Sequence, residues 1–287
     1  LAQQGFAIDA IYAERLARHQ EVLTSFSGSA SVLLSPKGEP WPAGHKLVQK
    51  DLAQTYRQLA NEGASYFYRG ALAQAVEKWM SDNGGVMSAN DFAAYKMHSR
   101  EPVHSDYRGY EIVGFGPPSS GGVHVAEILN TLEPFDLSAL DEVSRYHLVA
   151  EAMKLAFADR AYWLGDPAYV DVPKGLVSEK YARERAKLIR LNKTIADVEH
   201  GKPANAEVDL FDKHTTHIAT ADSEGNWVAI TTTVNTDFGS KVIIPGTGGV
   251  MNNQMDDFVA QPGAANIYGL IGTEANAIAP GKRPLSS

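Results

Sequence analysis

The chain has 287 residues, of which 44% are hydrophobic and 21% charged, with a formal net charge of −8 and no cysteine. This composition predicts a packed globular protein of one large or two small domains and argues against wholesale disorder. An acidic chain without a long basic run is a poor partner for nucleic acid or anionic membrane, and the lack of cysteine excludes disulfides, thiolate metal sites and cysteine nucleophiles.

No stretch approaches 18 consecutive apolar residues, so no transmembrane helix is expected in this segment. The start, Leu1-Ala-Gln-Gln-Gly5, has neither an initiator methionine nor the apolar core of a signal peptide. We therefore expect both ends, including Arg283-Pro-Leu-Ser-Ser287, to be cuts through a longer chain.

The part before about residue 200 is predicted to be mostly helical. Apolar residues at helical spacing predict helices over 51–60, with Gly63 as a stop, and over 71–80. Ser88 begins another helix, because Asp91 follows three residues later in a near capping box. The apolar faces of the first two helices are expected to consist of Leu52, Tyr56 and Leu59, and of Leu72, Ala75, Val76 and Trp79.

The longest predicted helix covers residues 143–163. One stripe along it is interpreted as facing the core rather than a ligand, and it contains Tyr146, Ala150, Met153, Phe157 and Ala161.

A short strand over 111–115 runs into the turn-forming sequence Gly116-Pro-Pro-Ser-Ser-Gly-Gly122. Ser119 and Ser120 could be nucleophiles, but the G-x-S-x-G context of a nucleophile elbow is missing. A packed loop near the site is the better interpretation.

After residue 200 the pattern changes. Residues 192–209 are polar and charged, which predicts an exposed linker. A hairpin follows, with strands over 215–222 and 227–235 and a turn over 223–226.

The hairpin register places Thr233 opposite Thr215, and Thr233 and Asn235 on one strand face. Threonine is a weak nucleophile unless it begins a chain, where its own α-amino group can act as the base. That chemistry requires a cut before Thr215, which a preceding polar linker would allow. From spacing alone, threonines in a strand are usually β-branched residues that only build a sheet, and this interpretation is strongly favoured until the longer motifs are considered.

Several longer motifs occur in one order along the whole chain. Before the linker they are Glu21-Val-Leu-Thr24, Pro117-Pro-Ser-Ser-Gly-Gly122 and Ala156-Phe-Ala-Asp-Arg160. After it they are His214-Thr-Thr-His217, Thr231-Thr-Thr-Val-Asn235, Phe238-Gly-Ser240, Asn252-Asn-Gln-Met-Asp-Asp-Phe258 and Asn276-Ala-Ile-Ala-Pro-Gly-Lys-Arg-Pro-Leu-Ser-Ser287. Together they closely resemble γ-glutamyltranspeptidases over essentially all 287 residues.

The resemblance implies the α+β, four-layer αββα sandwich of N-terminal-nucleophile hydrolases, incomplete at both ends. Residues 1–214 would be the C-terminal part of a large subunit and 215–287 the N-terminal part of a small subunit, forming one structural domain after self-cleavage between His214 and Thr215. By the resemblance, Thr215 would be the nucleophile and Thr233 would help to activate it. Asn235, Gln254 and Asp257 would bind the donor ammonium, and Ser286 and Ser287 the donor carboxylate. Residues 262–273, including Tyr268, would form a lid.

The implied activity is hydrolysis or transfer of γ-glutamyl groups from glutathione and similar amides to water, amino acids or peptides. No cofactor is implied, the subunits would form a heterodimer from one precursor, and the location would be periplasmic or extracellular. An arginine before Leu1 and an oxyanion-hole Gly-Gly after Ser287 are further elements of the family, so this chain alone is expected to be inactive.

Alternatives stay open. The same fold could support a cephalosporin or glutaryl acylase or a poly-γ-glutamate depolymerase, although Asp257 favours a donor with a free α-amino group. A catalytically incompetent relative or fragment is a third possibility. Asp256 and Asp257 as a metal pair are less favoured because no further spaced acidic ligands accompany them. His214 and His217 are poor zinc co-ligands because, in an extended strand, they fall on opposite faces or beyond the cleavage point.

Overall fold

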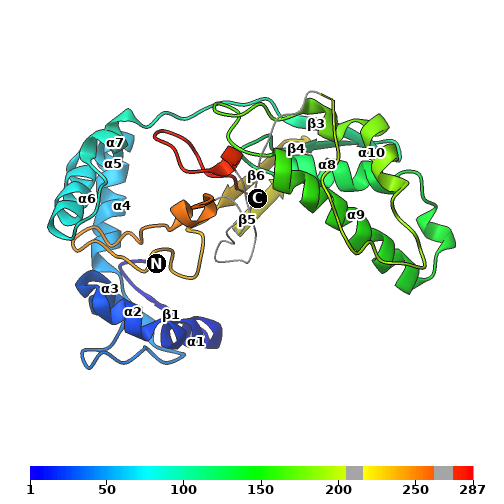
Figure 1. The fold of residues 1–287 in the computed structure, drawn as a ribbon. Helices are drawn as coiled ribbons and strands as arrows, with labels where there is room; N and C mark the ends of the chain where they lie inside the picture. The colour runs from blue at the N-terminus through cyan, green and yellow to red at the C-terminus, as the bar shows by residue number, and fades with distance from the viewer. Residues whose placement is uncertain (205–215, 262–273, 287) are drawn as a thin grey trace. The chain divides into compact units, whose positions relative to one another are not determined.

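The computed structural model describes residues 1–204, 216–261 and 274–286. The chain divides into two compact units, each built from two stretches of sequence. Unit 1 contains Leu1–His98 and His217–Asn253, and unit 2 contains Ser99–Thr216 and Gln254–Ser287. Figure 1 shows the ribbon of each unit.

Unit 1 consists mainly of helices, coloured blue to cyan in Figure 1. A two-stranded antiparallel pair joins β1 (Phe6–Ala7) to β2 (Lys46–Leu47). The helices are α1 (Ala10–Arg18), α2 (Gln20–Ser25), α3 (Ser27–Leu33), α4 (Lys50–Glu62), α5 (Ala64–Tyr68), α6 (Ala71–Asp82) and α7 (Ala89–Ala94).

Local sequence signals begin and end several of these helices. The Asp9 carboxylate accepts from the N–H of Tyr12 at 2.7 Å and caps α1. The predicted capping box before α7 is confirmed, with Asp91 accepting from the Ser88 N–H at 2.7 Å. The stop after α4 is confirmed as well, because Gly63 has a φ of +67°, which favours glycine.

The predicted helices over 51–60 and 71–80 are confirmed as α4 and α6. In α6, Leu72 and Val76 are buried, as their spacing indicates. In α4 the expected face is wrong in part. Tyr56 is exposed, and the buried positions are Ala53 and Thr55, because Thr55 donates a hydrogen bond to the carbonyl of Thr247 at 2.7 Å.

The segment 242–244 lies between two apolar clusters of unit 1. Ile243 packs in the cluster of α1 to α3, and Val242 and Ile244 pack with α6. Ser29 of α3 fixes this segment, since its hydroxyl donates to the carbonyl of Lys241 at 2.6 Å and accepts from the N–H of Ile243 at 2.9 Å. The chain that follows the predicted catalytic hairpin is thereby anchored in the core.

In unit 2, an antiparallel hairpin packs beside three α-helices, which are coloured green in Figure 1. The hairpin pairs β3 (Val103–Tyr107) with β4 (Tyr110–Gly114), which confirms the predicted strand at 111–115. The helices are α8 (Gly121–Leu132), α9 (Glu142–Trp163) and α10 (Glu179–Ala186), and short 3-10 turns are η1 (Leu137–Ala139), η2 (Lys174–Val177), η3 (Gln254–Asp257) and η4 (Glu274–Asn276).

The position of the long helix α9 is confirmed, but its predicted core-facing stripe is wrong. Tyr146 and Met153 are exposed. The buried face instead mixes apolar residues with polar ones: Leu148, Glu151, Ala152, Leu155, Ala156, Asp159, Arg160 and Trp163. A search for apolar spacing selects the wrong face because charged side chains are buried here with partners.

The predicted exposed linker is also partly wrong. Within the described residues 192–204, Ile195 and Val198 pack against the apolar cluster of α8 and α9. The buried Asp159 carboxylate accepts from the N–H of Gly201 at 2.5 Å, and Arg185 donates to the carbonyl of Glu199 at 2.9 Å. Polar composition predicted solvent exposure, whereas these backbone groups bind buried charges.

The later hairpin joins β5 (Thr216–Ala221) to β6 (Trp227–Thr232). Its turn is stabilised by Asp222, whose carboxylate accepts from the N–H groups of Glu224 at 2.9 Å and Asn226 at 3.0 Å. The return strand is shorter than predicted, because β6 ends at Thr232 and Asn235 has a φ of +74°. Thr233 and Asn235 therefore do not share a strand face, and the pairing of Thr233 with Thr215 lies outside the described residues.

Candidate active site

The loop after β6 brings Thr233 and Asn235 together. The Asn235 N–H donates to the Thr233 hydroxyl oxygen at 2.8 Å, and the Asn235 side-chain amide donates to the carbonyl of Asn253 at 3.1 Å. Asn235 is buried, and its left-handed backbone is a conformation that asparagine tolerates better than most residues. The loop thus turns sharply at the two residues for which chemistry is predicted.

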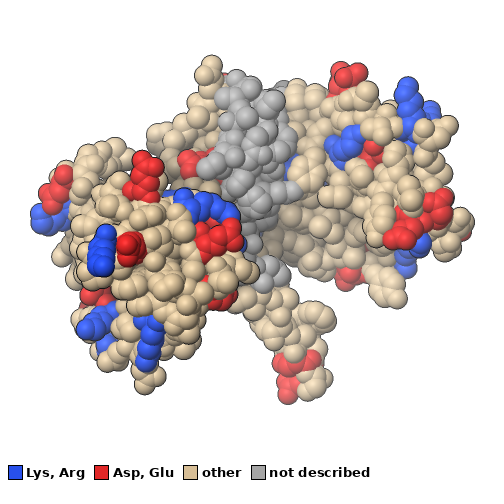
Figure 2. Space-filling model, turned by 90° about the horizontal axis from the view of Figure 1, so that it is seen from below, with Lys and Arg blue, Asp and Glu red and all other residues tan. Residues whose placement is uncertain are grey.

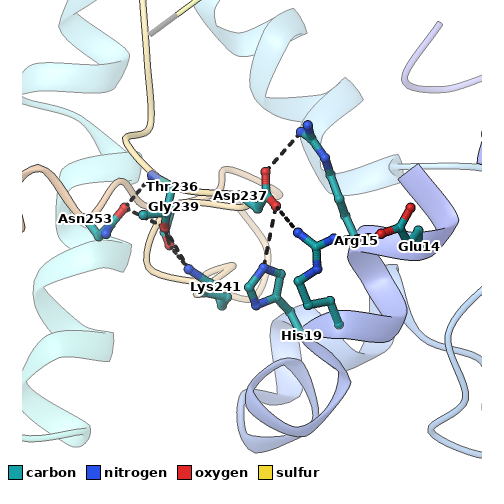
Figure 3. Close-up of polar contacts among 9 residues, drawn as sticks. Glu14, Arg15, His19, Thr236, Asp237, Gly239, Lys241 and Asn253 are labelled. Atoms are coloured by element: carbon teal, nitrogen blue, oxygen red, sulfur yellow. Dashed lines mark hydrogen bonds and ion pairs between the residues drawn. The ribbon is translucent and has the colours of Figure 1, made fainter. Parts of the chain in front are cut away.

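Asn253 connects this loop to the segment before η3. Its backbone N–H donates to the carbonyl of Val234 at 3.2 Å, and its side-chain oxygen accepts from the Thr236 N–H at 3.0 Å. The Lys241 ammonium donates to the Thr236 hydroxyl at 2.7 Å (Figure 3). The Asn253 and Lys241 side chains therefore fix the loop on one side.

Asp237 fixes the other side of the same loop to helix α1. Its carboxylate lies 3.0 Å from Arg15, 3.9 Å from Arg18 and 3.7 Å from the His19 ring (Figure 3). Phe238 packs edge-on against Tyr12 at a centroid distance of 5.3 Å. The hairpin for which catalysis is predicted therefore continues into a segment held by both ionic and aromatic contacts.

In unit 2, Gln254 and Asp257 lie in the short turn η3. The Gln254 amide donates to a carboxylate oxygen of Asp257 at 2.6 Å, and Asp257 is only 3% exposed. A carboxylate withdrawn from water in this way is suited to bind a cationic group, because its desolvation must be offset by charge pairing.

Ser286 pairs with the proline-rich loop before α8. The Ser286 N–H donates to the carbonyl of Pro118 at 2.7 Å, and the Ser120 N–H donates to the carbonyl of Ser286 at 2.6 Å. The preference for a packed loop over a catalytic serine agrees with this geometry, since Ser120 is fully buried and its hydroxyl accepts from Nε of Arg160 at 2.8 Å.

Asn276 links the two segments of unit 2 that carry Asp257 and Ser286, for which donor binding is predicted. Its side-chain amide donates to the carbonyl of Asp257 at 2.6 Å, and its side-chain oxygen accepts from the N–H of Leu285 at 2.9 Å. Asn276 and Leu285 are both 0% exposed. Asp257 and Ser286 are therefore attached to one buried side chain.

The structure groups the predicted site residues into two sets. Thr233 and Asn235 meet in unit 1, and Gln254, Asp257 and Ser286 belong to unit 2. The remaining predicted residues, His214, Thr215, Tyr268 and Ser287, lie outside the described residues, as does the whole predicted lid over 262–273. Within the described ranges, no group of three or more His, Cys, Asp or Glu side chains could hold a metal ion.

Sequence reasoning did not assign roles to Ser120, Arg160 or Asn276. All three lie within the quoted motifs, which was the available signal. Their roles depend on contacts between segments far apart in sequence, such as the 40 residues that separate Ser120 from Arg160. Periodicity and local spacing carry no information on such contacts.

Besides the predicted site residues, the structure buries a polar cluster between α8, α9 and α10, formed by Glu127, Asp159 and Arg185. Burial raises the pKa of Glu127 well above its ordinary value, and the hydrogen bond and charge of Asp159 raise it further, while Arg185 opposes them. Arg185 lies 2.9 Å from Asp159. The surroundings therefore favour the neutral form of Glu127 beside the ion pair of Arg185 with Asp159, and the three residues join the three helices.

Charges of both signs are interspersed over the described residues of the face shown in Figure 2. Among the described helices, none is long and apolar enough to cross a membrane.

Comparison with known proteins gives one consistent result. The family model described as Gamma-glutamyltranspeptidase matches residues 1–287. The chain is 41% identical to a glutathione hydrolase proenzyme of Escherichia coli over 100% of this chain and 50% of that protein. It is also 40% identical to the acylase ACY 1 proenzyme of a Pseudomonas species, over 100% of this chain and 49% of that protein.

Solved structures agree. The Helicobacter pylori gamma-glutamyltranspeptidase is 37% identical with a TM-score of 0.69, covering 72% of this chain and 61% of that one. A cephalosporin acylase from Bacillus halodurans is 30% identical with a TM-score of 0.83, covering 99% and 49%. These likenesses confirm the predicted fold class of mixed helices and strands, that of N-terminal-nucleophile hydrolases. The chain spans about half the length of the curated relatives it matches.

Proposed function

Since the chain belongs to the gamma-glutamyltranspeptidase family, we propose that it is part of a γ-glutamyl hydrolase and transferase that activates itself by cleavage before Thr215. The observation that carries this proposal is the 41% identity to a glutathione hydrolase proenzyme over the whole chain. Glutathione and related γ-glutamyl amides are the proposed donors, and water, amino acids and peptides the proposed acceptors.

The proposed self-cleavage uses the Thr215 hydroxyl. Its oxygen attacks the carbonyl carbon of His214, the peptide C–N bond breaks, and an ester forms together with a free α-amine on Thr215. Water then hydrolyses the ester and leaves a carboxylate on His214. The new amine has an ordinary pKa of about 7.7–8.0, which allows it to act as a base near neutral pH.

In turnover, the same hydroxyl attacks the γ-carbonyl of the donor, and the amine leaving group takes a proton. The γ-glutamyl ester on Thr215 is then released by water as glutamate, or by an amine as a new γ-glutamyl compound. Thr233 is the proposed partner of the Thr215 hydroxyl. Its own hydroxyl oxygen already accepts from the Asn235 N–H, which fixes its orientation.

The donor's α-amino acid end is the proposed ligand of the unit 2 residues. The buried Asp257 carboxylate pairs with the ammonium, and the hydroxyl groups of Ser286 and Ser287 suit the carboxylate. This arrangement favours γ-glutamyl donors over glutaryl donors, which lack the ammonium. The second candidate is an acylase or a poly-γ-glutamate depolymerase. The 40% identity to an acylase proenzyme supports the acylase.

The self-cleavage is tested on denaturing gels with the full-length precursor and its Thr215→Ala variant. We expect two bands for the wild type and one for the variant, and Thr215→Ser should still cut and keep partial activity. One band for both proteins, or two for both, would contradict the proposal. After cleavage, the two products are proposed to stay together as a large–small heterodimer, and export to the periplasm or cell exterior remains a prediction.

The donor assignment is tested with Asp257→Asn and two anilides. Truncating one member of a buried charge pair costs about 2–5 kcal/mol. The transition-state stabilisation calculated from kcat/KM for a γ-glutamyl anilide should fall by that amount. The glutaryl anilide should be affected far less because it lacks the ammonium. Equal losses on the two substrates would rule out Asp257 as the group that binds the amine.

A further inference from the structure

One buried side chain connects the two residues proposed to bind opposite groups of the donor. Asn276 lies in η4 and is 0% exposed. It donates to the carbonyl of Asp257 at 2.6 Å and accepts from the N–H of Leu285 at 2.9 Å. Leu285 directly precedes Ser286, so each bond ends on or beside a donor-binding residue.

The backbone around Asn276 strengthens this link. The N–H of Val259 donates to the carbonyl of Asn276 at 3.0 Å, and Val259 pairs with Ala277 in a parallel bridge. The segment after Asp257 therefore runs beside the segment that contains Asn276. With its side chain buried and both of these bonds made, Asn276 has little freedom to move.

The other side of Ser286 is fixed independently. Its carbonyl accepts from the N–H of the buried Ser120 at 2.6 Å, and the side chain of Leu285 lies in a separate apolar cluster with Val123 and Trp163. A shift of Asn276 would therefore displace the Asp257 end of the arrangement relative to a Ser286 end that stays in place.

We propose that Asn276 is a positioning residue that sets the spacing between Asp257 and Ser286, so that one donor engages both with its ammonium and its carboxylate. This inference depends on the proposed function, because it concerns the recognition of that same donor. Asn276 touches no reacting atom in this proposal. It makes the two contacts cooperative by fixing the distance between them.

Cooperativity of this kind is measured with four anilide donors. The γ-glutamyl anilide carries both groups, glutaryl anilide lacks the amine, 4-aminobutanoyl anilide lacks the carboxylate, and butanoyl anilide lacks both. The four values of kcat/KM form a double cycle in the substrate, whose coupling factor reports how much one contact improves the other. A purely structural defect lowers all four values together and leaves the factor unchanged.

The variants are made in the full-length, self-cleaved enzyme. Asn276→Ala removes both bonds, and Asn276→Asp keeps the acceptor for Leu285 but loses the donor to Asp257. We expect each to lower the coupling factor by roughly tenfold, within the range of interaction energies between groups in contact.

Asn130→Ala is the matched control. Asn130 is also a buried asparagine of unit 2, and its amide donates to the carbonyl of Val177 at 2.8 Å while its oxygen accepts from Ser105 at 3.0 Å. This control should lose comparable thermal stability and keep the wild-type coupling factor.

The outcomes separate the two proposals. A wild-type enzyme that does not hydrolyse the γ-glutamyl anilide would refute the proposed function. An active wild type together with an unchanged coupling factor in both Asn276 variants would refute the positioning role alone. The same conclusion would follow if both variants failed to fold while Asn130→Ala folded, because Asn276 would then be structural.

Discussion

The contact between Ser120 and Arg160 allows a stability prediction to be worked from the structure. Both side chains are 0% exposed, and Nε of Arg160 donates to the Ser120 hydroxyl at 2.8 Å. Ser120→Ala removes an acceptor from a buried cation. Hydrogen bonds to charged groups contribute about 1.5–3 kcal/mol, because the charge would otherwise lose its solvation without compensation.

For a domain of about 150–250 residues, 1 kcal/mol shifts Tm by about 2–4 °C, so Ser120→Ala should lower Tm by about 3–12 °C. Ser105→Ala is the comparison. It removes a hydrogen bond of 3.0 Å to the neutral amide of Asn130, which is worth about 1 kcal/mol and about 2–4 °C.

Differential scanning calorimetry of the full-length variants would measure both shifts in one buffer. The Ser120 variant keeps the backbone N–H that donates to the carbonyl of Ser286, but it loses the Arg160 contact that fixes this backbone, so the KM for a γ-glutamyl donor should rise as well. If Ser120→Ala cost no more Tm than Ser105→Ala, the buried charge would not be responsible and the reasoning would be wrong.

Three further predictions concern stability. Since burial raises the pKa of Glu127, the free energy of unfolding should fall as pH rises from the ordinary glutamate range through the raised folded-state pKa. Glu127→Gln stays neutral, and its Tm should fall less over that range. Asp237→Asn removes the ion pair of 3.0 Å with the half-exposed Arg15 and should cost under about 1 kcal/mol, with the difference in Tm shrinking in high salt. In Gly28→Ala the new Cβ would collide with the backbone carbonyl of Ile243, so unfolding in urea should show a loss of about 1–3 kcal/mol; an unchanged midpoint would exclude that close approach.

The sequence predicts local structure well where the signal is local. The apolar spacing in α6, the capping box at Ser88 and the glycine stop at Gly63 all appear as expected. Each depends on residues within one or two helical turns, so one segment contains all the information that determines it.

The prediction fails where polar groups are buried. The face of α9 that packs in the core includes Glu151, Asp159 and Arg160, and the polar segment at Gly201 is held by one of them. Hydrophobic periodicity assigns such residues to solvent. Their burial becomes favourable only when partners from other segments pair with them, and a single segment does not reveal those partners.

The candidate site shows the same division. The order of motifs along the chain determined the family and named Asp257 and Ser286, since motif identity belongs to the sequence alone. Only the tertiary structure revealed that Asn276 hydrogen-bonds to the backbone of Asp257 and of Leu285, the residue before Ser286. It also revealed that Ser120, itself bound to Arg160, holds Ser286 from the other side. Hydrogen bonds between distant segments form when the chain packs in three dimensions, and for this reason the fold decided the spacing of Asp257 and Ser286, the residues predicted to bind the donor.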